Sequence, residues 1–151
     1  MRHIASVADL KSLVGQEVAV SSWIKIDRAR INLFAQASGD HQWIHVDVER
    51  CRDESPYGAP IAPGFLTLSL LPMLLQSSIT FPPFKLALNY GLNGVRFPAP
   101  VQVDQCIRAH MTLQAVEDIA GGVQMAWEVT LECDGTNKPV CVAELVLRHY
   151  D

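Results

Sequence analysis

The feature that most limits the possible folds is an apolar run of fifteen residues, IAPGFLTLSLLPMLL, at positions 61–75. Its large side chains fall on nearly every face of a helix, so such a helix needs other structure around it. The run is too short to span a bilayer, and Gly64 and Pro72 interrupt it. It therefore predicts a buried helix that starts near Pro63 and kinks or restarts at Pro72, with no membrane insertion.

The second half of the chain can supply that surrounding structure, because its apolar and polar residues alternate as they do in β-strands. The last apolar stretch is apolar on both faces, which indicates a central strand or one covered at an interface. Asp134-Gly135 is a turn signal, and short turns between successive strands indicate an antiparallel sheet. Strands are expected at 85–97, 107–116, 123–133 and 139–150.

The first half reads mainly as short helices with recognisable ends. Ser6, Asp27 and Asp47 are suitable N-caps, and Gly39 is suited to end the helix that Asp27 starts. Helices followed by strands predict one α+β domain over 1–151, a curved antiparallel sheet around one long helix. Helices are expected at 6–15, 28–38 and 47–52, a strand at 17–26, and a loop or short extended piece at 38–46.

Charge and cysteine content argue against several classes of function. The net charge is −4 and Lys and Arg form no cluster, so we expect no nucleic-acid partner. The cysteines form no CxxC pair and have no zinc-like spacing with histidine, which predicts reduced thiols and no metal site. The start of the chain has no continuous apolar segment, so a cytoplasmic location is expected. The four cysteines are Cys51, Cys106, Cys133 and Cys141.

An acid and an imidazole lie five positions apart in the stretch SGDHQWIH. An imidazole can take or give a proton, and Asp40 accepts hydrogen bonds when ionised, so the side chains of His45 and Asp40 together can hold one water. The alternative is that Asp40 only makes an Asx-type turn after Gly39. The remaining histidines are expected at the surface or at packing boundaries: His3, His41, His110 and His149.

Gly64 is a second candidate because it stands at the start of the apolar helix. The first amides of a helix lack intrahelical acceptors, and a glycine lets a ligand oxygen approach the backbone closely. Such an amide can stabilise a thioester carbonyl that becomes an enolate. The alternative is that Gly64 only packs tightly against the sheet. The helix residues 73–75 are expected in the core, or along an acyl tunnel, and Tyr57 at its entrance.

Together these residues resemble the MaoC-like dehydratase family, also called (R)-specific enoyl-CoA hydratases, and especially its nodulation-protein-N-like branch. The family pattern runs F-A-x-x-[ST]-G-D, four residues, H-x-D, and then I-A-H-G before an apolar helix. A second signature of the branch resembles NYGLNGVRFPAPV at 89–101, and the whole resemblance covers Trp23 to Tyr150. The residues in register are Phe34, Ala35, Ser38, Gly39, Asp40, His45, Asp47, Gly58, Ile61, Ala62 and Gly64.

The resemblance implies a hot dog fold, normally in a homodimer, and reversible syn addition of water to a trans-2-enoyl-CoA to give an (R)-3-hydroxyacyl-CoA. It makes Asp40 and His45 the catalytic pair, without deciding which is base and which is acid, and it makes the Gly64 amide the oxyanion donor. It implies no metal and no redox cofactor, with CoA present only as part of the acyl-CoA substrate. Asn93 and Arg96 lie in the second signature, where Arg96 either contacts substrate phosphates or makes a structural contact.

Two departures from the pattern leave alternatives open. Gln42-Trp43 replaces the common Asn-Pro, as in the nodulation-N-like branch, and Pro63 replaces the usual histidine before Gly64. An acyl-CoA thioesterase can share the fold, but it needs a carboxylate aimed at the thioester carbon. A non-catalytic acyl-thioester binding module is the third reading. Acyl chain length and pathway are not determined by these residues.

Overall fold

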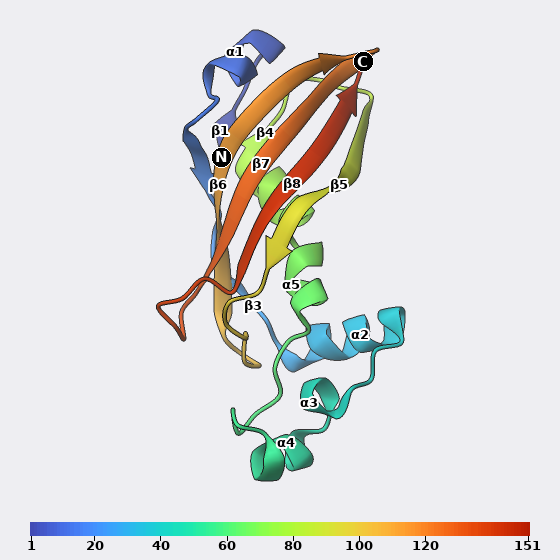
Figure 1. Cartoon of the computed structure of the whole chain (residues 1–151), viewed down its shortest axis with the longest axis vertical. Helices are drawn as coiled ribbons and strands as arrows, with labels where there is room; N and C mark the ends of the chain where they lie inside the picture. The colour runs from blue at the N-terminus through green and yellow to red at the C-terminus, as the bar shows by residue number, and fades with distance from the viewer.

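The computed structural model describes residues 1–151 and contains one six-stranded antiparallel sheet (Figure 1). The strand order is β2-β6-β7-β8-β5, and β3 pairs with β6 beyond the end of β2. A separate parallel pair joins β1 (Arg2–His3) to β4 (Ile79–Thr80). The sheet strands are β2 (Glu17–Val20), β3 (Ile24–Lys25), β5 (Leu86–Arg96), β6 (Cys106–Ile119), β7 (Gly122–Cys133) and β8 (Cys141–Tyr150).

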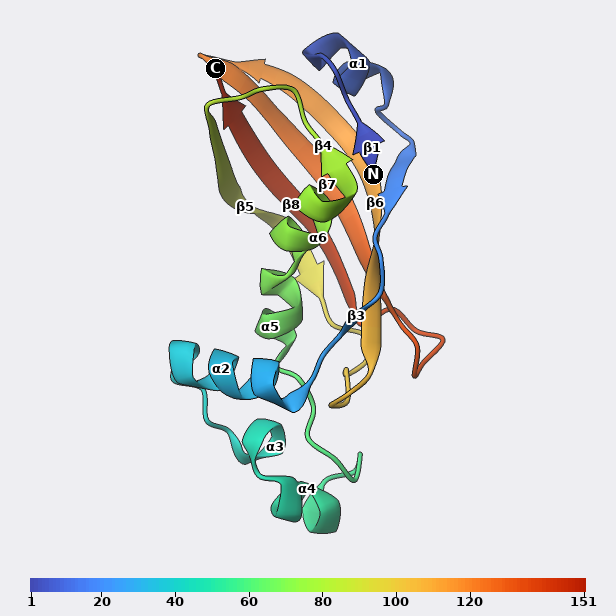
Figure 2. The ribbon, with the colours of Figure 1, turned by 180° about the vertical axis from the view of Figure 1, so that it is seen from behind.

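Two successive helices, α5 (Gly64–Ser69) and α6 (Leu71–Ser78), lie along one face of this sheet (Figure 2). Three more helices, α2, α3 and α4, lie beyond the end of the sheet where α5 begins, and α1 lies at the opposite end (Figures 1 and 2). Their bounds are α1 (Val7–Ser12), α2 (Arg28–Ser38), α3 (Trp43–Val46) and α4 (Val48–Glu54). The α+β class predicted from the sequence is confirmed.

The helix ends follow the predicted capping residues. Ser6 accepts from the Asp9 amide at 3.1 Å, Asp27 from the Arg30 amide at 2.9 Å, and Asp47 from the Arg50 amide at 3.0 Å. Gly39 ends α2 in the left-handed conformation, with φ at 75°. These local bonds need no tertiary partner, which is why the sequence reveals them. The predicted restart at Pro72 is also confirmed, because α6 begins one residue before it.

Two local predictions are wrong. Residues 17–26 form two short strands rather than one, because Ser21 takes over a ladder position. Its hydroxyl accepts from the Ala109 amide at 2.8 Å, while its own amide donates to the Ala109 carbonyl at 2.9 Å. The loop expected at 38–46 contains α3, which is held from outside by a 3.1 Å bond from the Ile61 amide to the Ile44 carbonyl.

The core lies between the sheet and one face of α5 and α6. The apolar sides of β6 and β7 are buried as predicted, and each large side chain taken fully out of water there contributes about 1.5–3 kcal/mol. The helices are not covered all round, however: Phe65 is 68% exposed and Met73 is 40% exposed. The buried helix residues are Leu66, Thr67, Leu71, Leu74, Leu75 and Ser78.

The strand that is apolar on both faces, β8, is a central strand of the sheet, which is one of the two predicted alternatives. β8 lies between β7 and β5, so the chain itself covers both of its edges. One outer edge of the sheet is formed by β2 and β3 and the other by β5, whose residues are all exposed apart from Val95. Register shifts between Asn89 and Gly91 and between Leu92 and Gly94 mark irregular pairing along it.

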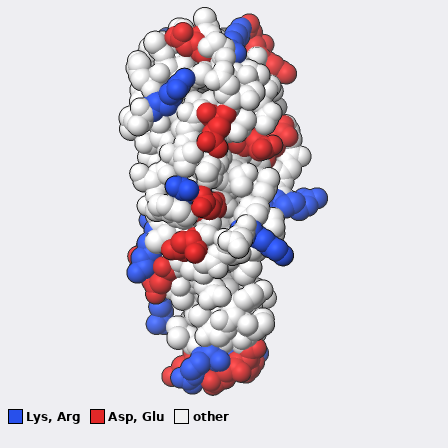
Figure 3. Space-filling model, turned by 90° about the vertical axis from the view of Figure 1, so that its left-hand side faces the viewer, with Lys and Arg blue, Asp and Glu red and all other residues white.

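Opposite charges are interspersed over the surface that Figure 3 shows. All four cysteines are free thiols, as predicted. No helix of the chain has the length and apolar character needed to cross a membrane.

A charged cluster on the face of β6 opposite the core leads to a pH-dependent prediction. His110 contacts Glu17 at 3.1 Å and Glu132 at 2.9 Å, and Arg108 donates to Glu132 at 2.7 Å. The hydrogen bond to Glu132 is the main cause that raises the pKa of His110 above its usual 6.5. A raised folded-state pKa stabilises the fold below the unfolded pKa, and this contribution is lost as the pH rises through the folded-state pKa.

We therefore expect the free energy of unfolding of wild type to exceed that of His110→Asn most at about pH 5, with a smaller difference at about pH 8. Urea unfolding of both proteins across this range measures the difference. A gap between the two that stays constant with pH would contradict the assignment of this cluster.

Candidate active site

A cavity of about 330 Å³ lies where α5 begins, at the end of the sheet that faces α3. It brings together two of the predicted site residues, His45 and Gly64, and Tyr57 also lines it. The lining contains no Asp or Glu side chain. Its other members are Ile61, Ala62, Thr67, Phe97, Pro98, Ala99, Pro100, Val101 and Val140.

The His45 ring is held in one orientation by a backbone group. Its Nδ1 lies 2.7 Å from the Ile61 carbonyl oxygen, and a carbonyl only accepts, so Nδ1 carries the proton. In the neutral ring Nε2 then has a free lone pair and can accept a proton. The Ile61 amide is bonded in turn to the Ile44 carbonyl, so α3 and the segment before α5 fix each other.

Gly64 is the first residue of α5, where an amide has no intrahelical acceptor. The Ala62 amide is already bonded to the Val101 carbonyl at 2.8 Å, and the Thr67 hydroxyl donates to the Gly64 carbonyl at 2.6 Å. A Cβ at position 64 would approach the Phe97 ring to 3.0 Å. Gly64 therefore packs tightly, against Phe97, and it lines the cavity, while the oxyanion role of its amide stays a prediction.

Asp40 does not line this cavity. Its Oδ1 accepts from the Gln42 amide at 3.3 Å, its own amide donates to the Ser38 hydroxyl at 3.3 Å, and the residue is exposed. This is the Asx-type turn that the sequence left as the alternative reading. The structure contains no hydrogen bond between Asp40 and His45, and their catalytic pairing stays a prediction.

Asn93 and Arg96 lie on the edge strand β5, outside the lining of this cavity. The Asn93 amide donates to the Glu144 carboxylate on β8 at 2.5 Å, and Arg96 donates to the carbonyl of its neighbour Val95 at 2.7 Å. Each side chain therefore has a local structural contact. A role in substrate binding stays a prediction for both.

α3 and α4 form a small unit that supports His45. The Arg50 guanidinium lies 4.3 Å from the centre of the Trp43 ring, and the buried Cys51 thiol donates to the Ile44 carbonyl at 3.4 Å. Burial is the main cause that raises the pKa of Cys51, so it is a packed thiol rather than a thiolate. Trp43 packs within this unit.

Sequence reasoning missed three contributors to the cavity. Thr67, a polar residue inside an apolar run, was a visible signal of the bond that it makes to Gly64. The Ile61 carbonyl and the Phe97 ring left no such signal, because they act through backbone geometry and long-range contact. The chain has no group of three or more His, Cys, Asp or Glu side chains placed to hold a metal ion.

Known proteins resemble this chain over most of its length. The family model described as "MaoC like domain" matches residues 9–133. The 3-hydroxyacyl-thioester dehydratase Z of Mycobacterium tuberculosis (strain ATCC 25618 / H37Rv) is 51% identical over 150 residues, 99% of both chains. Nodulation protein N of Rhizobium meliloti (strain 1021) is 43% identical over 148 residues, 95% of this chain and 91% of that protein.

A solved structure shows the same fold at lower identity. The R-hydratase PhaJ1 from Pseudomonas aeruginosa, in the unliganded form, superposes with a TM-score of 0.72 at 21% identity, over 91% of this chain and 82% of the other. The sheet around a central helix is thus the hot dog fold that the resemblance implied. The chain belongs to the MaoC-like dehydratase family and is an enzyme of its hydratase/dehydratase type.

Proposed function

We propose that this protein is an (R)-specific enoyl-CoA hydratase that interconverts trans-2-enoyl-CoA and (R)-3-hydroxyacyl-CoA. The observation that carries the proposal is the His45 ring, oriented by the Ile61 carbonyl, in the same cavity as Gly64 at the start of α5. This arrangement supplies a proton acceptor and a backbone donor to one bound thioester. The relatives named for dehydratase activity on 3-hydroxyacyl thioesters support it.

In the proposed hydration, a water oxygen bonds to C3 while one of the water protons passes to His45 Nε2. The π electrons move toward the thioester carbonyl, and the Gly64 amide donates to the enolate oxygen that forms. The enolate then collapses as C2 takes the proton back from His45, which balances the addition of H and OH. Asp40 holds and polarises the water from the turn before α3. The reverse sequence is the dehydration.

The two alternative functions are less well supported. A thioesterase needs a carboxylate directed at the thioester carbon, whereas the relative at 51% identity is named for dehydratase activity on 3-hydroxyacyl thioesters. A binding module without activity does not need the fixed His45 tautomer. We propose no metal and no redox cofactor, with CoA as part of the substrate, no nucleic-acid partner, and a cytoplasmic location.

Asp40→Asn and His45→Asn test the proposed pair. Asn at position 40 can still accept from the Gln42 amide, so it removes the charge and keeps the turn. Asn at position 45 can place an N–H near the former Nδ1 while removing Nε2. We expect each variant to lose about 10²-fold or more in kcat/KM for crotonyl-CoA, measured as loss of enoyl absorbance.

Matched variants remote from the cavity are the controls for this experiment. Asp118→Asn makes the same chemical change near the end of β6, and His110→Asn makes it on the outer face of β6. Both variants should keep wild-type rates of hydration. Thermal unfolding checks that all four variants fold. Wild-type rates in both Asp40→Asn and His45→Asn would overturn the mechanism, and release of free thiol without hydration would favour a thioesterase.

The role of the Gly64 amide can be separated from its packing. Gly64→Ala brings a methyl group against Phe97, so lost activity could come from a displaced ring alone. The double variant Gly64→Ala/Phe97→Leu makes room for the methyl group. If the carbonyl of the substrate must approach the amide closely, we expect the double variant to stay about 10²-fold below Phe97→Leu in kcat. Equal kcat values in these two proteins would leave Gly64 with a packing role only.

We also propose that the protein is a homodimer joined through β5. This edge strand has unpaired backbone groups and exposed apolar side chains, which are features of an edge that another strand covers. Pairing of two β5 strands would continue the sheet. The exposed side chains on it are Leu86, Leu88, Tyr90 and Leu92.

Light scattering at micromolar concentration should therefore give twice the chain mass of 16.7 kDa. Leu86→Lys puts a charge on the edge and should shift the protein toward monomer. Val14→Lys, at an apolar residue of similar exposure outside the sheet, should leave the mass unchanged. A wild-type monomer under these conditions contradicts the proposed dimer.

A further inference from the structure

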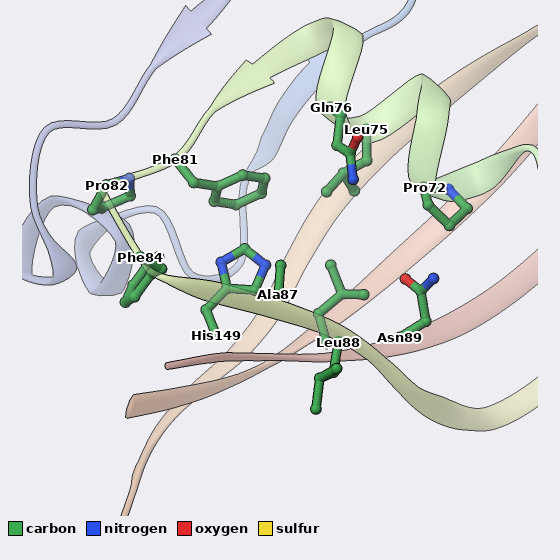
Figure 4. A pocket seen from close by; sticks show the side chains of 11 residues that line it. Pro72, Leu75, Gln76, Phe81, Pro82, Phe84, Ala87, Leu88, Asn89 and His149 are labelled. Atoms are coloured by element: carbon green, nitrogen blue, oxygen red, sulfur yellow. The ribbon is translucent and has the colours of Figure 1, made fainter. Parts of the chain in front are cut away.

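A second cavity, of about 280 Å³, lies between α6 and the start of β5, at the other end of the helix pair from His45 (Figure 4). Apolar side chains, among them Leu75 and Leu88, form much of its wall. Gln76 from α6 and Asn89 from β5 bring amide groups to it, and His149 from the end of β8 brings an imidazole. No Lys, Arg, Asp or Glu lines this cavity.

His149 is the unusual member of this cavity. The sequence placed it at the surface or at a packing boundary, but only 6% of it is exposed, and its Nδ1 is enclosed without a hydrogen-bond partner. The rings of Phe81 and Phe84 stand edge-on to it, each with its centroid at 5.0 Å. Burial lowers the pKa of His149, so the ring is neutral at physiological pH.

A buried polar side chain without a partner is rare in folded proteins and needs an explanation. Replacing it by an apolar ring would give a dry, well-packed wall beside Phe81 and Phe84. Figure 4 shows instead the imidazole among the side chains of the cavity, with one ring nitrogen on the Phe84 side and the other on the Ala87 side. The other ring nitrogen, Nε2, also has no hydrogen-bond partner but is not enclosed, so it is the atom that a group entering the cavity can reach.

The helix pair connects this cavity to the proposed active site. The His45 cavity takes Gly64 and Thr67 from α5. A middle cavity takes Ser69 and Pro72, and the His149 cavity takes Pro72 and Gln76. The three cavities therefore follow one another in order along α5 and α6, and the second and third share Pro72.

The facing wall of the three cavities comes from β5 and the residues just after it. Its residue numbers fall along the row while those of the helices rise, because β5 and the helix pair run in opposite directions. Phe97, just after β5, borders the first cavity, Leu92 the second, and Ala87 the third. Asn89 borders both the second and the third. The second and third cavities therefore adjoin at Pro72 and Asn89, and the His45 cavity lies beyond them in the same row along the helix pair.

We infer that the His149 cavity binds an uncharged oxygen group, such as a hydroxyl, near the far end of the acyl chain of the substrate. This inference rests on the proposed enoyl thioester activity. A hydroxyl can donate to the imidazole or accept from it, and it can also pair with the Gln76 or Asn89 amide. A carboxylate is disfavoured because no cation lines the cavity. The row of cavities along α5 and α6 between the two ends accommodates the hydrocarbon part of the chain.

The test uses pairs of trans-2-enoyl-CoA substrates of increasing length, with each pair differing only in a terminal methyl or hydroxymethyl group. For wild type we expect kcat/KM to favour the hydroxylated member by about tenfold at the lengths that reach His149. In His149→Phe, which keeps an aromatic ring beside Phe81 and Phe84, this ratio should fall to one or below. His3→Phe, at an exposed histidine, should keep the wild-type ratio.

Each outcome of this test bears on one claim. A wild-type preference for the methyl member at every length, or a hydroxyl preference that survives in His149→Phe, overturns the inference. The wild-type series decides the question even where the variant does not fold. Hydration of crotonyl-CoA by wild type is the separate check on the proposed function, because its short chain needs no contact with His149.

Discussion

The burial of one face of α5 and α6 against the sheet is the interaction on which the rest of the structure depends. The leucines of this pair and the apolar sides of β6, β7 and β8 belong to one hydrophobic core cluster, which α1, α2 and β4 extend at its margins. The sheet is fixed by its own antiparallel ladders, but its position over the helices is fixed by this contact. The same contact sets where α5 begins, at the end of the sheet that faces α3.

The candidate site follows from that position. The segment before α5 must leave the sheet there, and its Ile61 carbonyl and amide are both used, one by His45 and the other by Ile44. A helix of four residues would not be stable alone, so α3 depends on this tertiary contact. His45 is therefore oriented by the packing of the core helices rather than by its own short helix.

The sequence revealed those features that are determined locally or by periodicity. Caps at Ser6, Asp27 and Asp47, the alternation along β6 and β7, and the restart at Pro72 all belong to this class. Long-range bonds carried no such signal: α3 needs Ile61, the strand break needs Ser21 against Ala109, and the enclosure of His149 needs two phenylalanines far from it in sequence. The motif identified Asp40 and His45 but did not give their separation, which depends on how the α2–α3 turn closes.

Pro63, where the sequence leaves the family pattern, is compatible with the proposed oxyanion site for a backbone reason. The Ala62 amide is bonded to Val101, and Leu66 is the first residue whose amide bonds back to the Pro63 carbonyl. Between them a histidine would add one more amide, whereas proline adds none. The amides left without an acceptor at this corner are then those of Gly64 and Phe65, and Gly64 is the one whose residue lines the cavity. Proline in place of histidine removes a side chain from the site, but it leaves the Gly64 amide in place. It also leaves one fewer backbone N–H beside that amide.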